Sequence, residues 1–358
     1  MKKTIKHIAI LCSLDMFANT VRPLELKKQL IKKGYKVSLI SNTELIENIS
    51  SKLIFVKQTR HERAIYSYFD KMINGKLYFI YLLLVLNFRA RKLKKLIKEQ
   101  SFDLLIIENH LQAFVAKYAL NVPYILDLDV PYFDELYYTN KIDKWSYRKL
   151  ISIYKDIYRK AKNVNFQWHT YSDYVKKTYY NGSNFIEFNF GCHQKSKLLK
   201  AKFNKNPKII CMGYLGGKWV NLSLLSRLSK LFPIDVYGGP EPDNKWGLNY
   251  RGYAPTTDIL SQYQFGLITI SDDKLRRSSF SSKHLEYISY GLPVLTPEWR
   301  FDKILQKTSI YYNEKNFVKK IKDYSSEKKW QEISAMSFKT ARKLNWISTL
   351  RPLLIAMN

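Results

Sequence analysis

The chain has 358 residues, of which 46% are hydrophobic and 15% aromatic; this excludes a disordered protein and allows two domains that each bury a core. Lysine and arginine total 60 against 30 acidic residues, and the net charge of +30 favours an anionic partner: lipid, nucleic acid or a phosphorylated substrate. The scattered cysteines Cys12, Cys192 and Cys211 show no metal-ligand or disulfide pattern, which indicates a reducing compartment.

The N-terminal half alternates short apolar segments with amphipathic ones, which is typical of a parallel α/β sheet. We expect its strands at 7–13, 36–41, 52–57, 103–108, 124–129 and 163–168. A helix is predicted from Pro23 to Lys33, ended by Gly34, and a long helix within 64–99.

The longest apolar run, LYFIYLLLVL, covers residues 77–86 and is too short to cross a bilayer, which takes about 20 residues. No signal peptide is predicted either, since the apolar stretch at 8–11 is too short for one. The run is apolar all round at helical pitch, which predicts a buried helix. Basic residues follow it up to Lys98, and we expect this end to face anionic lipid.

Residues 191–207 are rich in lysine and lack apolar periodicity, which predicts a linker. A second α/β stretch follows, with expected strands at 208–214, 234–240, 248–253, 265–271 and 293–297. Expected helices lie at 221–232, 256–263 and 282–290. Gly291 and Pro293 are suited to ending the last of these helices.

Two Rossmann-like, doubly wound α/β domains that face a cleft are therefore the expected fold class. The first would cover 1–190 and the second 208–340. Residues 341–358 would form a C-terminal helix that packs back on the first domain. Ligands of such sheets bind where the strands end, so the turns after strands are the segments to inspect.

One such turn is MGYLGGKWVN, residues 212–221. Gly216 and Gly217 would let backbone N–H groups approach a phosphate, and Lys218 would add a positive charge. The spacing is not that of a P-loop. The alternative is an ordinary turn between a strand and a helix.

The second turn is SSFSSKHLEYISYGLPVLTP, residues 278–297. Ser281 and Ser282 are suitable N-cap residues, so that the start of the next helix could face an anion. Lys283 and Glu286 share one helix face, where the lysine could meet a diphosphate and the carboxylate both ribose hydroxyls. The alternative is an exposed ion pair of structural value only.

The string SSKHLEYISYGLPVLTP resembles the nucleotide-sugar site of GT-B glycosyltransferases, especially those similar to glycosyltransferase family 4. GYLGGKWVNLSLLSRL, VYGGP and YRGYAPTTDILSQYQFGLITIS continue the resemblance in the same order over about residues 208–300, whereas 1–190 match only as a generic first domain. The resemblance implies a cytoplasmic enzyme, peripheral at the inner face of the plasma membrane. It would move a sugar from a nucleotide-sugar donor, expected to be a UDP sugar, to a glycan or lipid-linked acceptor of surface polysaccharide. No cofactor is implied.

Residue by residue, the resemblance implies that Glu286 holds the donor ribose and that Tyr253 lies beside the nucleobase. It assigns the diphosphate to Lys283 together with Gly216, Gly217 and Lys218. Retaining members usually carry a second glutamate eight positions before the ribose-binding one, where this chain has Ser278. The stereochemical outcome is therefore left open.

Inverting transfer needs a base for the acceptor hydroxyl, and carboxylates are the usual choice. Asp127 and Asp129 close the strand at 124–129 and, as alternate residues, can point the same way. Either could be the base, or both could cap the next segment. His110 follows another strand and is a further candidate, with a surface or capping histidine as the alternative.

The Asp127-Leu-Asp129 string also matches the metal-binding DXD of GT-A transferases, and Asp272-Asp273 is another acidic pair. GT-B enzymes need no such metal, so we expect no metal site. The rival functions are a basic nucleic-acid-binding protein, a sugar-nucleotide epimerase on the same scaffold and a catalytically inactive partner subunit. Since no nucleic-acid-binding motif is present in the sequence, we expect no nucleic-acid partner.

Overall fold

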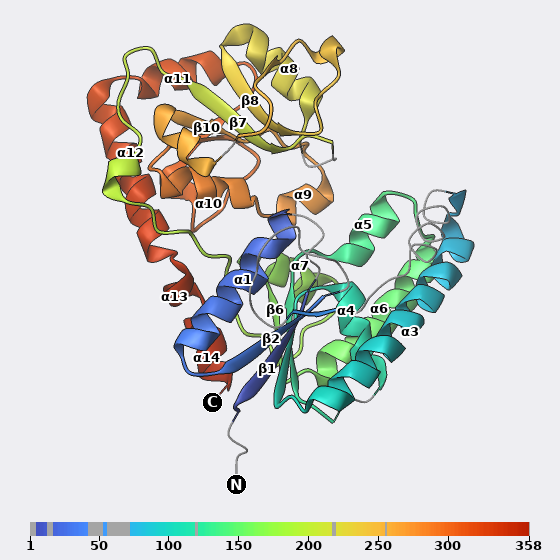
Figure 1. Ribbon diagram of the computed structural model, residues 1–358. Helices are drawn as coiled ribbons and strands as arrows, with labels where there is room; N and C mark the ends of the chain where they lie inside the picture. Colours follow the sequence, from blue (N-terminus) through green and yellow to red (C-terminus); the bar gives the residue numbers. More distant parts are fainter. Residues whose placement is uncertain are drawn as a thin grey trace. The chain divides into compact units, whose positions relative to one another are not determined.

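The computed structural model describes residues 5–12, 17–41, 53–55, 72–118, 121–216, 220–254 and 256–357, without the side chains of 17–20, 53–55 and 274. The chain divides into two compact units (Figure 1). The N-terminal unit comprises Met1–Phe190 and Thr349–Asn358, and the C-terminal unit comprises Gly191–Ser348. Each unit contains one sheet of parallel strands, so the predicted α/β class is confirmed.

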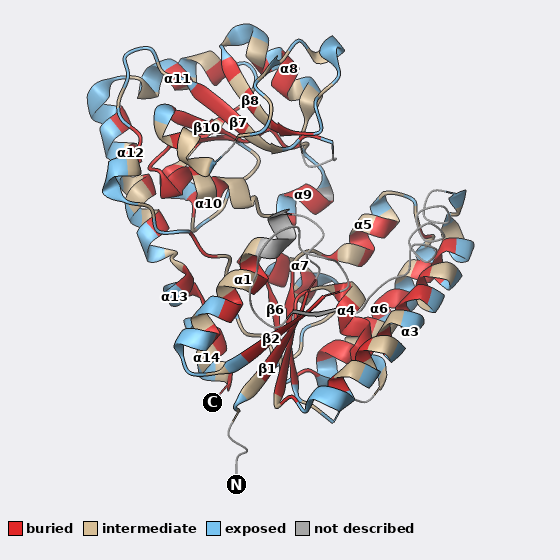
Figure 2. Cartoon of the chain, viewed as in Figure 1, coloured by how far each residue is buried: buried red, intermediate tan, exposed pale blue. Residues whose placement is uncertain are grey.

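The N-terminal sheet has the strand order β3-β2-β1-β4-β5-β6, which is that of a doubly wound fold. Its strands are β1 (His7–Cys12), β2 (Lys36–Ser41), β3 (Leu53–Phe55), β4 (Leu104–Ile107), β5 (Tyr124–Leu128) and β6 (Asn163–Phe166). Every paired strand is parallel, and β1, β4 and β5 are buried almost throughout (Figure 2). The six strands predicted in this half are confirmed, apart from positions 13, 52, 56 and 57, which lie outside the described residues.

Helices lie between these strands and after the last of them. They are α1 (Phe17–Lys32), α3 (Gly75–Gln100), α4 (His110–Ala113), α5 (Tyr132–Tyr138), α6 (Lys144–Lys160), α7 (His169–Thr178) and α14 (Arg351–Met357). The prediction that Pro23 opens the first helix is wrong. Helix α1 already begins at Phe17 and contains Pro23, whose ring nitrogen leaves out one backbone hydrogen bond. The long helix predicted within 64–99 is α3, and 64–71 lie outside the described residues.

Helix α3 buries one face and exposes a second apolar one. Its buried residues are Tyr78, Phe79, Leu82, Val85, Leu86, Ala90, Leu93 and Ile97. Leu77, Ile80, Leu84 and Phe88 are 66%, 53%, 66% and 44% exposed. The prediction that the apolar run is buried all round is therefore wrong, because no described element covers this face. No described helix is both long and apolar enough to pass through a bilayer.

The C-terminal sheet has the order β12-β11-β10-β7-β8-β9, again doubly wound. Its strands are β7 (Ile209–Tyr214), β8 (Ile234–Gly239), β9 (Asn249–Tyr250), β10 (Phe265–Leu267), β11 (Val294–Pro297) and β12 (Ser309–Tyr312). Its helices are α8 (Leu222–Leu231), α9 (Lys274–Ser278), α10 (Ser282–Ser289), α11 (Phe317–Tyr324), α12 (Glu327–Lys343) and α13 (Trp346–Thr349). Strand β12 and the helices α9, α11 and α12 were not predicted from the sequence, and the helix expected at 256–263 is a 3₁₀ helix, Thr257–Gln262.

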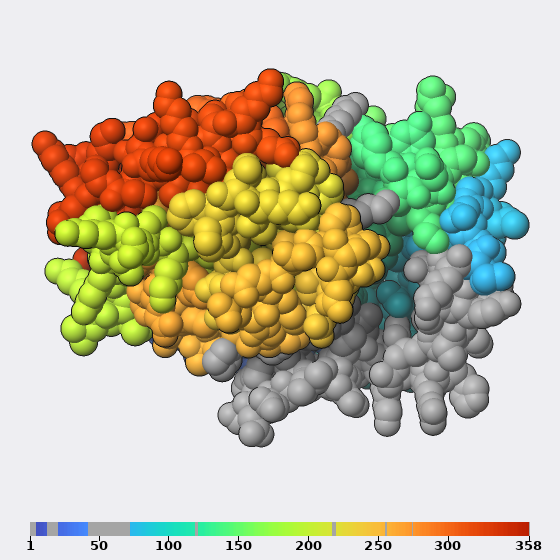
Figure 3. All heavy atoms as spheres, turned by 90° about the horizontal axis from the view of Figure 1, so that it is seen from above, coloured from blue at the N-terminus to red at the C-terminus, as the bar shows by residue number. Residues whose placement is uncertain are grey.

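The segment 191–207, predicted as a linker, lies against the C-terminal unit and runs beside α12 (Figures 1 and 3). The Cys192 amide donates to the Leu344 carbonyl at 2.7 Å, and the Ala201 amide donates to the Tyr290 carbonyl at 2.8 Å. The single helix predicted at 341–358 is instead the end of α12 followed by α13 and α14. Residues up to 348 group with the C-terminal unit, and only Thr349–Asn358, which include α14, group with the N-terminal one. There the Lys162 amine contacts the Met357 carbonyl at 3.4 Å.

Candidate functional site

Strands β7 and β8 end side by side in the C-terminal unit, and their glycines allow an unusually close approach. Gly238 has a φ of +128°, and a Cβ at this position would lie 1.7 Å from the Gly213 carbonyl oxygen. Only glycine fits here, since any side chain would push the two strand ends apart. The amide of Leu215 donates to the carbonyl of Gly239 at 2.7 Å and closes this edge.

Two residues that we predicted from the sequence as nucleotide-sugar ligands, Gly216 and Tyr253, lie around this edge. A Cβ at Gly216 would lie 2.6 Å from Pro240, and one at Gly239 would lie 2.2 Å from the Tyr253 hydroxyl. Gly216 and Tyr253 therefore both border the ends of β7 and β8. The Tyr253 side chain is 74% exposed, so that its ring is open to a ligand. Gly217 and Lys218 lie outside the described residues.

Helix α10 brings the other nominated residues to the same edge. The Lys283 amine lies 2.9 Å from each carboxylate oxygen of Glu286, and both side chains are about one-third exposed. A Cβ at Gly213 would lie 3.8 Å from the Lys283 stem, which places this pair beside the end of β7. Ser282 is the first residue of α10, and the Ser281 side chain at the N-cap makes no capping hydrogen bond.

A buried tyrosine fixes the orientation of α10. The Tyr287 hydroxyl accepts a hydrogen bond from the Met212 amide at 2.8 Å, and its ring packs where Gly266 leaves room for it. Lys283 lies one turn before Tyr287 on the same side of the helix, which agrees with its position beside Gly213 while Tyr287 contacts Met212. Lys283 and Glu286 remain about one-third exposed, on a helix that the contacts of Tyr287 hold against the sheet.

The resulting surface combines an amine, a carboxylate, an exposed phenol ring and a glycine-lined strand edge. These groups suit a ligand with a diphosphate, two vicinal hydroxyls and an aromatic base: the amine and backbone N–H groups for phosphate, the carboxylate for hydroxyls. The sequence-predicted residues Gly216, Tyr253, Ser282, Lys283 and Glu286 are all in the C-terminal unit.

In the N-terminal unit, Asp127 is fully buried at the end of β5 and forms an ion pair that sequence reasoning missed. The Arg22 guanidinium, only 1% exposed, donates to both carboxylate oxygens at 2.6 and 2.9 Å. The Asn165 amide donates to the same carboxylate at 2.8 Å. Three donors thus saturate a carboxylate with no access to solvent, an arrangement that fits a structural ion pair better than a base.

Asp129 has a different environment, two residues further along. It is half-buried, and its carboxylate accepts a hydrogen bond from the Val130 amide at 2.9 Å. Burial raises the pKa of this carboxyl to about 7, and the nearby carboxylates of Asp127 and Glu135 add to the rise. Asp129 can therefore take up and release a proton near neutral pH.

Glu108, at the end of β4 in the N-terminal sheet, is a further polar residue that we did not predict as a candidate from the sequence. It follows β4, the neighbour of β5, and its amide donates to the Leu11 carbonyl at 2.9 Å. Its side chain is 6% exposed, and its Oε1 atom has no hydrogen-bond partner among the described residues. Burial raises the pKa of this carboxyl well above its usual range, and the negative charge of Asp127 adds to the effect. Its position at the end of a predicted strand was the available signal.

His110 lies in a cluster of aromatic side chains and is 1% exposed. Its Nε2 atom is 2.9 Å from the Tyr158 hydroxyl, and the Phe133 ring packs edge-on at 4.8 Å. Burial lowers the pKa of the imidazole to about 3, so that the ring is neutral in the physiological range. These contacts favour a structural histidine of the core over a catalytic base.

The remaining polar candidates have local partners. Asp273 caps α9 by accepting from the Arg276 amide at 2.8 Å, and Asp272 accepts from the Arg277 guanidinium at 2.7 Å. Ser278, eight positions before Glu286, is buried, and its hydroxyl donates to the Leu275 carbonyl at 2.9 Å. Within the described ranges, no three His, Cys, Asp or Glu side chains gather as metal ligands would.

Comparisons with known proteins show the fold. No family model matches the sequence, and comparison with curated proteins gives no match. The chain is similar to sucrose-phosphate synthase from Thermosynechococcus elongatus, with 12% identity and a TM-score of 0.70 over 99% of this chain and 100% of that one. It is similar to Phytolacca americana UGT2 complexed with UDP-2-fluoro-glucose and pterostilbene, with 12% identity and a TM-score of 0.58 over 100% and 99% of the two chains.

A third similar structure is an α-glucosyltransferase in complex with UDP and a 13-mer DNA containing an HMU base. Its identity is 12% and its TM-score 0.59, with 99% of each chain covered. All three likenesses extend over both units and nearly the full length of either protein. The chain has the two-domain α/β fold of the GT-B glycosyltransferases.

Proposed function

We propose that this protein is a glycosyltransferase that moves a sugar from a nucleotide-sugar donor, UDP-activated in the first instance, to a glycan or lipid-linked acceptor. The observation that carries the proposal is the position of Lys283 and Glu286 beside Gly213, at the strand edge of a GT-B fold. Two similar structures were solved with UDP or a UDP sugar, which supports the choice of nucleotide.

Within this proposal, the diphosphate lies against Lys283, Gly216 and the first turn of α10, while Glu286 holds the ribose and Tyr253 flanks the base. The Lys283 amine forms an ion pair with the Glu286 carboxylate at 2.9 Å. A bound nucleotide would therefore contact this pair, with its diphosphate at the amine and its ribose at the carboxylate. Gly217 and Lys218 are proposed to complete the diphosphate site.

The proposed base is Asp129. Its pKa near 7 suits proton transfer from a hydroxyl at neutral pH, whereas the Asp127 carboxylate is occupied by Arg22 and Asn165. His110 is enclosed by aromatic rings, which leaves it no room to meet an acceptor. Glu108 is proposed to lie at the edge of the same acceptor site.

A thermal-shift panel of UDP, GDP, CMP and dTDP sugars tests the donor directly, since a true donor stabilises the folded chain by mass action. Consumption of the donor that requires an acceptor distinguishes transfer from epimerisation. A chain that no nucleotide sugar stabilises would be a binding protein or an inactive subunit instead.

Glu286→Ala is expected to weaken donor binding at least about tenfold, because a hydrogen bond to a charged group contributes about 1.5–3 kcal/mol. Calorimetry measures the affinity. Folding should be unaffected, since an exposed ion pair at this helix spacing contributes only about 0.2–0.5 kcal/mol. Glu332→Ala, an exposed glutamate on α12, is the matched control and should bind like wild type. Equal affinity in all three proteins would remove Glu286 from the site.

We further propose that the N-terminal unit binds the inner face of the plasma membrane through α3. The exposed Leu77, Ile80, Leu84 and Phe88 follow one another at helical spacing, and the exposed Arg91 and Lys95 continue the same stripe. The Lys92 amine lies 4.4 Å from the centre of the Phe88 ring, next to the stripe. A helix with an apolar stripe and a basic end suits an anionic bilayer surface.

The double variant Arg91→Gln, Lys95→Gln is expected to bind phosphatidylglycerol vesicles about 30-fold more weakly, at about 1 kcal/mol for each charge. Vesicle sedimentation at low salt measures this, and added salt should reproduce the loss in wild type. Lys319→Gln, Lys322→Gln removes two exposed lysines of α11 and is the control. Wild-type-like binding by the α3 variant, or binding that DNA abolishes in all three proteins, would argue against a membrane site on α3.

A further inference from the structure

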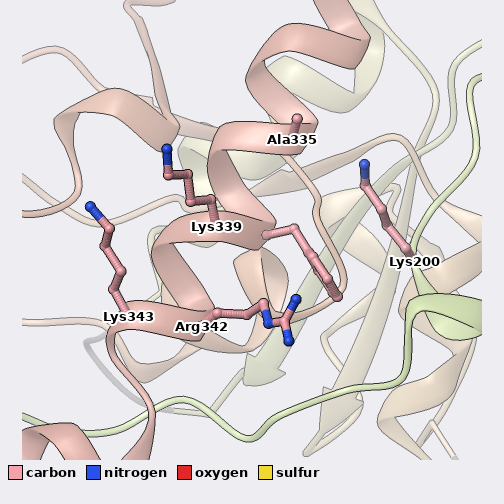
Figure 4. A pocket seen from close by; sticks show the side chains of 6 residues that line it. Lys200, Ala335, Lys339, Arg342 and Lys343 are labelled. Carbon is pink, nitrogen blue, oxygen red and sulfur yellow. The ribbon is translucent and has the colours of Figure 1, made fainter.

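A pocket of about 380 Å³ opens on the surface of α12, at its C-terminal end. Its lining consists of Lys200, Ala335, Phe338, Lys339, Arg342 and Lys343. Five of these residues come from one face of the helix, and Lys200 comes from the segment 191–207 that runs beside it. Figure 4 shows Lys200 opposite the helix, with the Arg342 guanidinium extending to the same side and Lys343 pointing outward.

The lining carries four cations and no acidic residue. Among the described residues, none of these four side chains forms an ion pair, whereas Arg227, Arg251 and Arg277 each pair with a carboxylate. The end of the α12 dipole stabilises a cation there by only about 0.3–1 kcal/mol. Like charges in one lining repel each other, and an anion in the pocket would reduce that repulsion.

The pocket is separate from the proposed donor site, although both adjoin α10. Lys200 packs over Gly291, where a Cβ would lie 3.1 Å from its stem. Gly291 follows the last turn of α10, whereas Lys283 lies in its first turn. These ends are roughly 12 Å apart at 1.5 Å rise per residue, so one phosphate cannot contact both Lys283 and Lys200.

We propose that this pocket, which we call the α12 pocket, binds a phosphate group carried by a small metabolite or by a lipid headgroup. Arginine offers a planar pair of N–H donors for phosphate oxygens, and Lys200, opposite the helix on the same side, adds a point charge. The side chains of Phe338 and Ala335 give the pocket an apolar wall for the organic part of the ligand. A volume of about 380 Å³ lies in the range of small-molecule sites.

Calorimetry of the full chain with inorganic pyrophosphate tests the soluble source. Saturating UDP is added so that the proposed donor site is filled. The α12 variant, Lys339→Gln with Arg342→Gln, is expected to bind pyrophosphate at least about tenfold more weakly than wild type. The α11 variant, Lys319→Gln with Lys322→Gln, removes the same charge in the same unit and should bind like wild type.

Sedimentation with phosphatidylcholine vesicles that contain phosphatidic acid tests the lipid source, with Arg91→Gln and Lys95→Gln present in every protein to suppress binding through α3. Vesicle binding lost only in the α12 variant, without pyrophosphate binding, assigns the pocket to a lipid phosphate. If neither probe separates the α12 variant from the α11 variant, the inference is overturned. If UDP fails to bind at all, the donor proposal fails, and the pyrophosphate comparison without UDP still decides this one.

Discussion

Asp129→Asn is expected to lower turnover by about 10²–10⁴-fold while donor affinity stays unchanged, because a positioned base contributes about that much and the donor residues lie in the other unit. Burial raises the pKa of the Asp129 carboxyl to about 7, which suits it to accept the proton of the acceptor hydroxyl at neutral pH. Steady-state kinetics with a soluble acceptor measures turnover, and calorimetry measures the donor affinity. The prediction rests on the proposed transferase activity.

The pH profile gives an independent readout. A base acts only when it is ionised, so the wild-type rate should rise with pH through about 7, whereas the residual rate of the asparagine variant should not. Asp173→Asn, an exposed aspartate on α7, is the matched control. EDTA should leave the wild-type rate unchanged. A rate that EDTA abolishes and Mn²⁺ restores would make Asp129 a metal ligand and contradict the assignment.

The same substitution is not expected to destabilise the fold. A folded-state pKa of about 7 lies above the ordinary carboxyl value, so the folded chain binds more protons than the unfolded chain between these pH values. Stability from this group is thus fully present at low pH and is lost as pH rises to about 7. Asparagine carries no charge to bury, so Asp129→Asn should be at least as stable as wild type above pH 7.

Arg22→Met is expected to destabilise the N-terminal unit by about 3–5 kcal/mol, because it leaves the Asp127 carboxylate buried without a counter-charge. The guanidinium also donates to the Phe188 and Asn189 carbonyls at 3.2 and 3.1 Å, and these acceptors would lose their donor. Urea unfolding followed by fluorescence measures the loss. Since two units need not unfold in one step, the transition midpoint of the N-terminal unit is the quantity to compare.

Arg159→Met is the control, since the Arg159 side chain is 69% exposed and its pair with Asp156 should contribute less than about 1 kcal/mol. Combining Arg22→Met with Asp127→Leu removes both charges and should cost less than Arg22→Met alone. If Arg22→Met costs no more than the control, the ion pair is not structural. Asp127 would then become a base candidate again.

The strands were predictable because each is a short apolar run, long enough to cross a buried sheet and bounded by turn residues. Strand β12 escaped because its residues alternate between half-buried and buried over only four positions. The exposed stripe of α3 could not be foreseen, since periodicity shows that a helix is apolar but not which face meets a neighbour.

The candidate site was predictable to different degrees in the two units. Lys283 and Glu286 are three positions apart on one helix, so local geometry alone brings them together, at 2.9 Å. The distinction between Asp127 and Asp129 depends on Arg22, which stands 105 positions before Asp127. Such long-range pairs leave no trace in the spacing of a single sequence, and the burial that raises the pKa of Glu108 has the same origin.

The contacts of Arg22 also set an order of events during synthesis. Its guanidinium bonds to Asp127 and to the carbonyl of Phe188, which is 166 positions further along the chain. At about 5–20 residues per second, roughly 10–30 seconds of translation separate the making of Arg22 from that of Phe188. Until these partners have been synthesised, the guanidinium of Arg22 in the nascent chain has to remain exposed to solvent. The buried contacts of Arg22 in the N-terminal unit can therefore form only late, after β6, which ends at Phe166, and the residues that follow it up to Phe188 have left the ribosome.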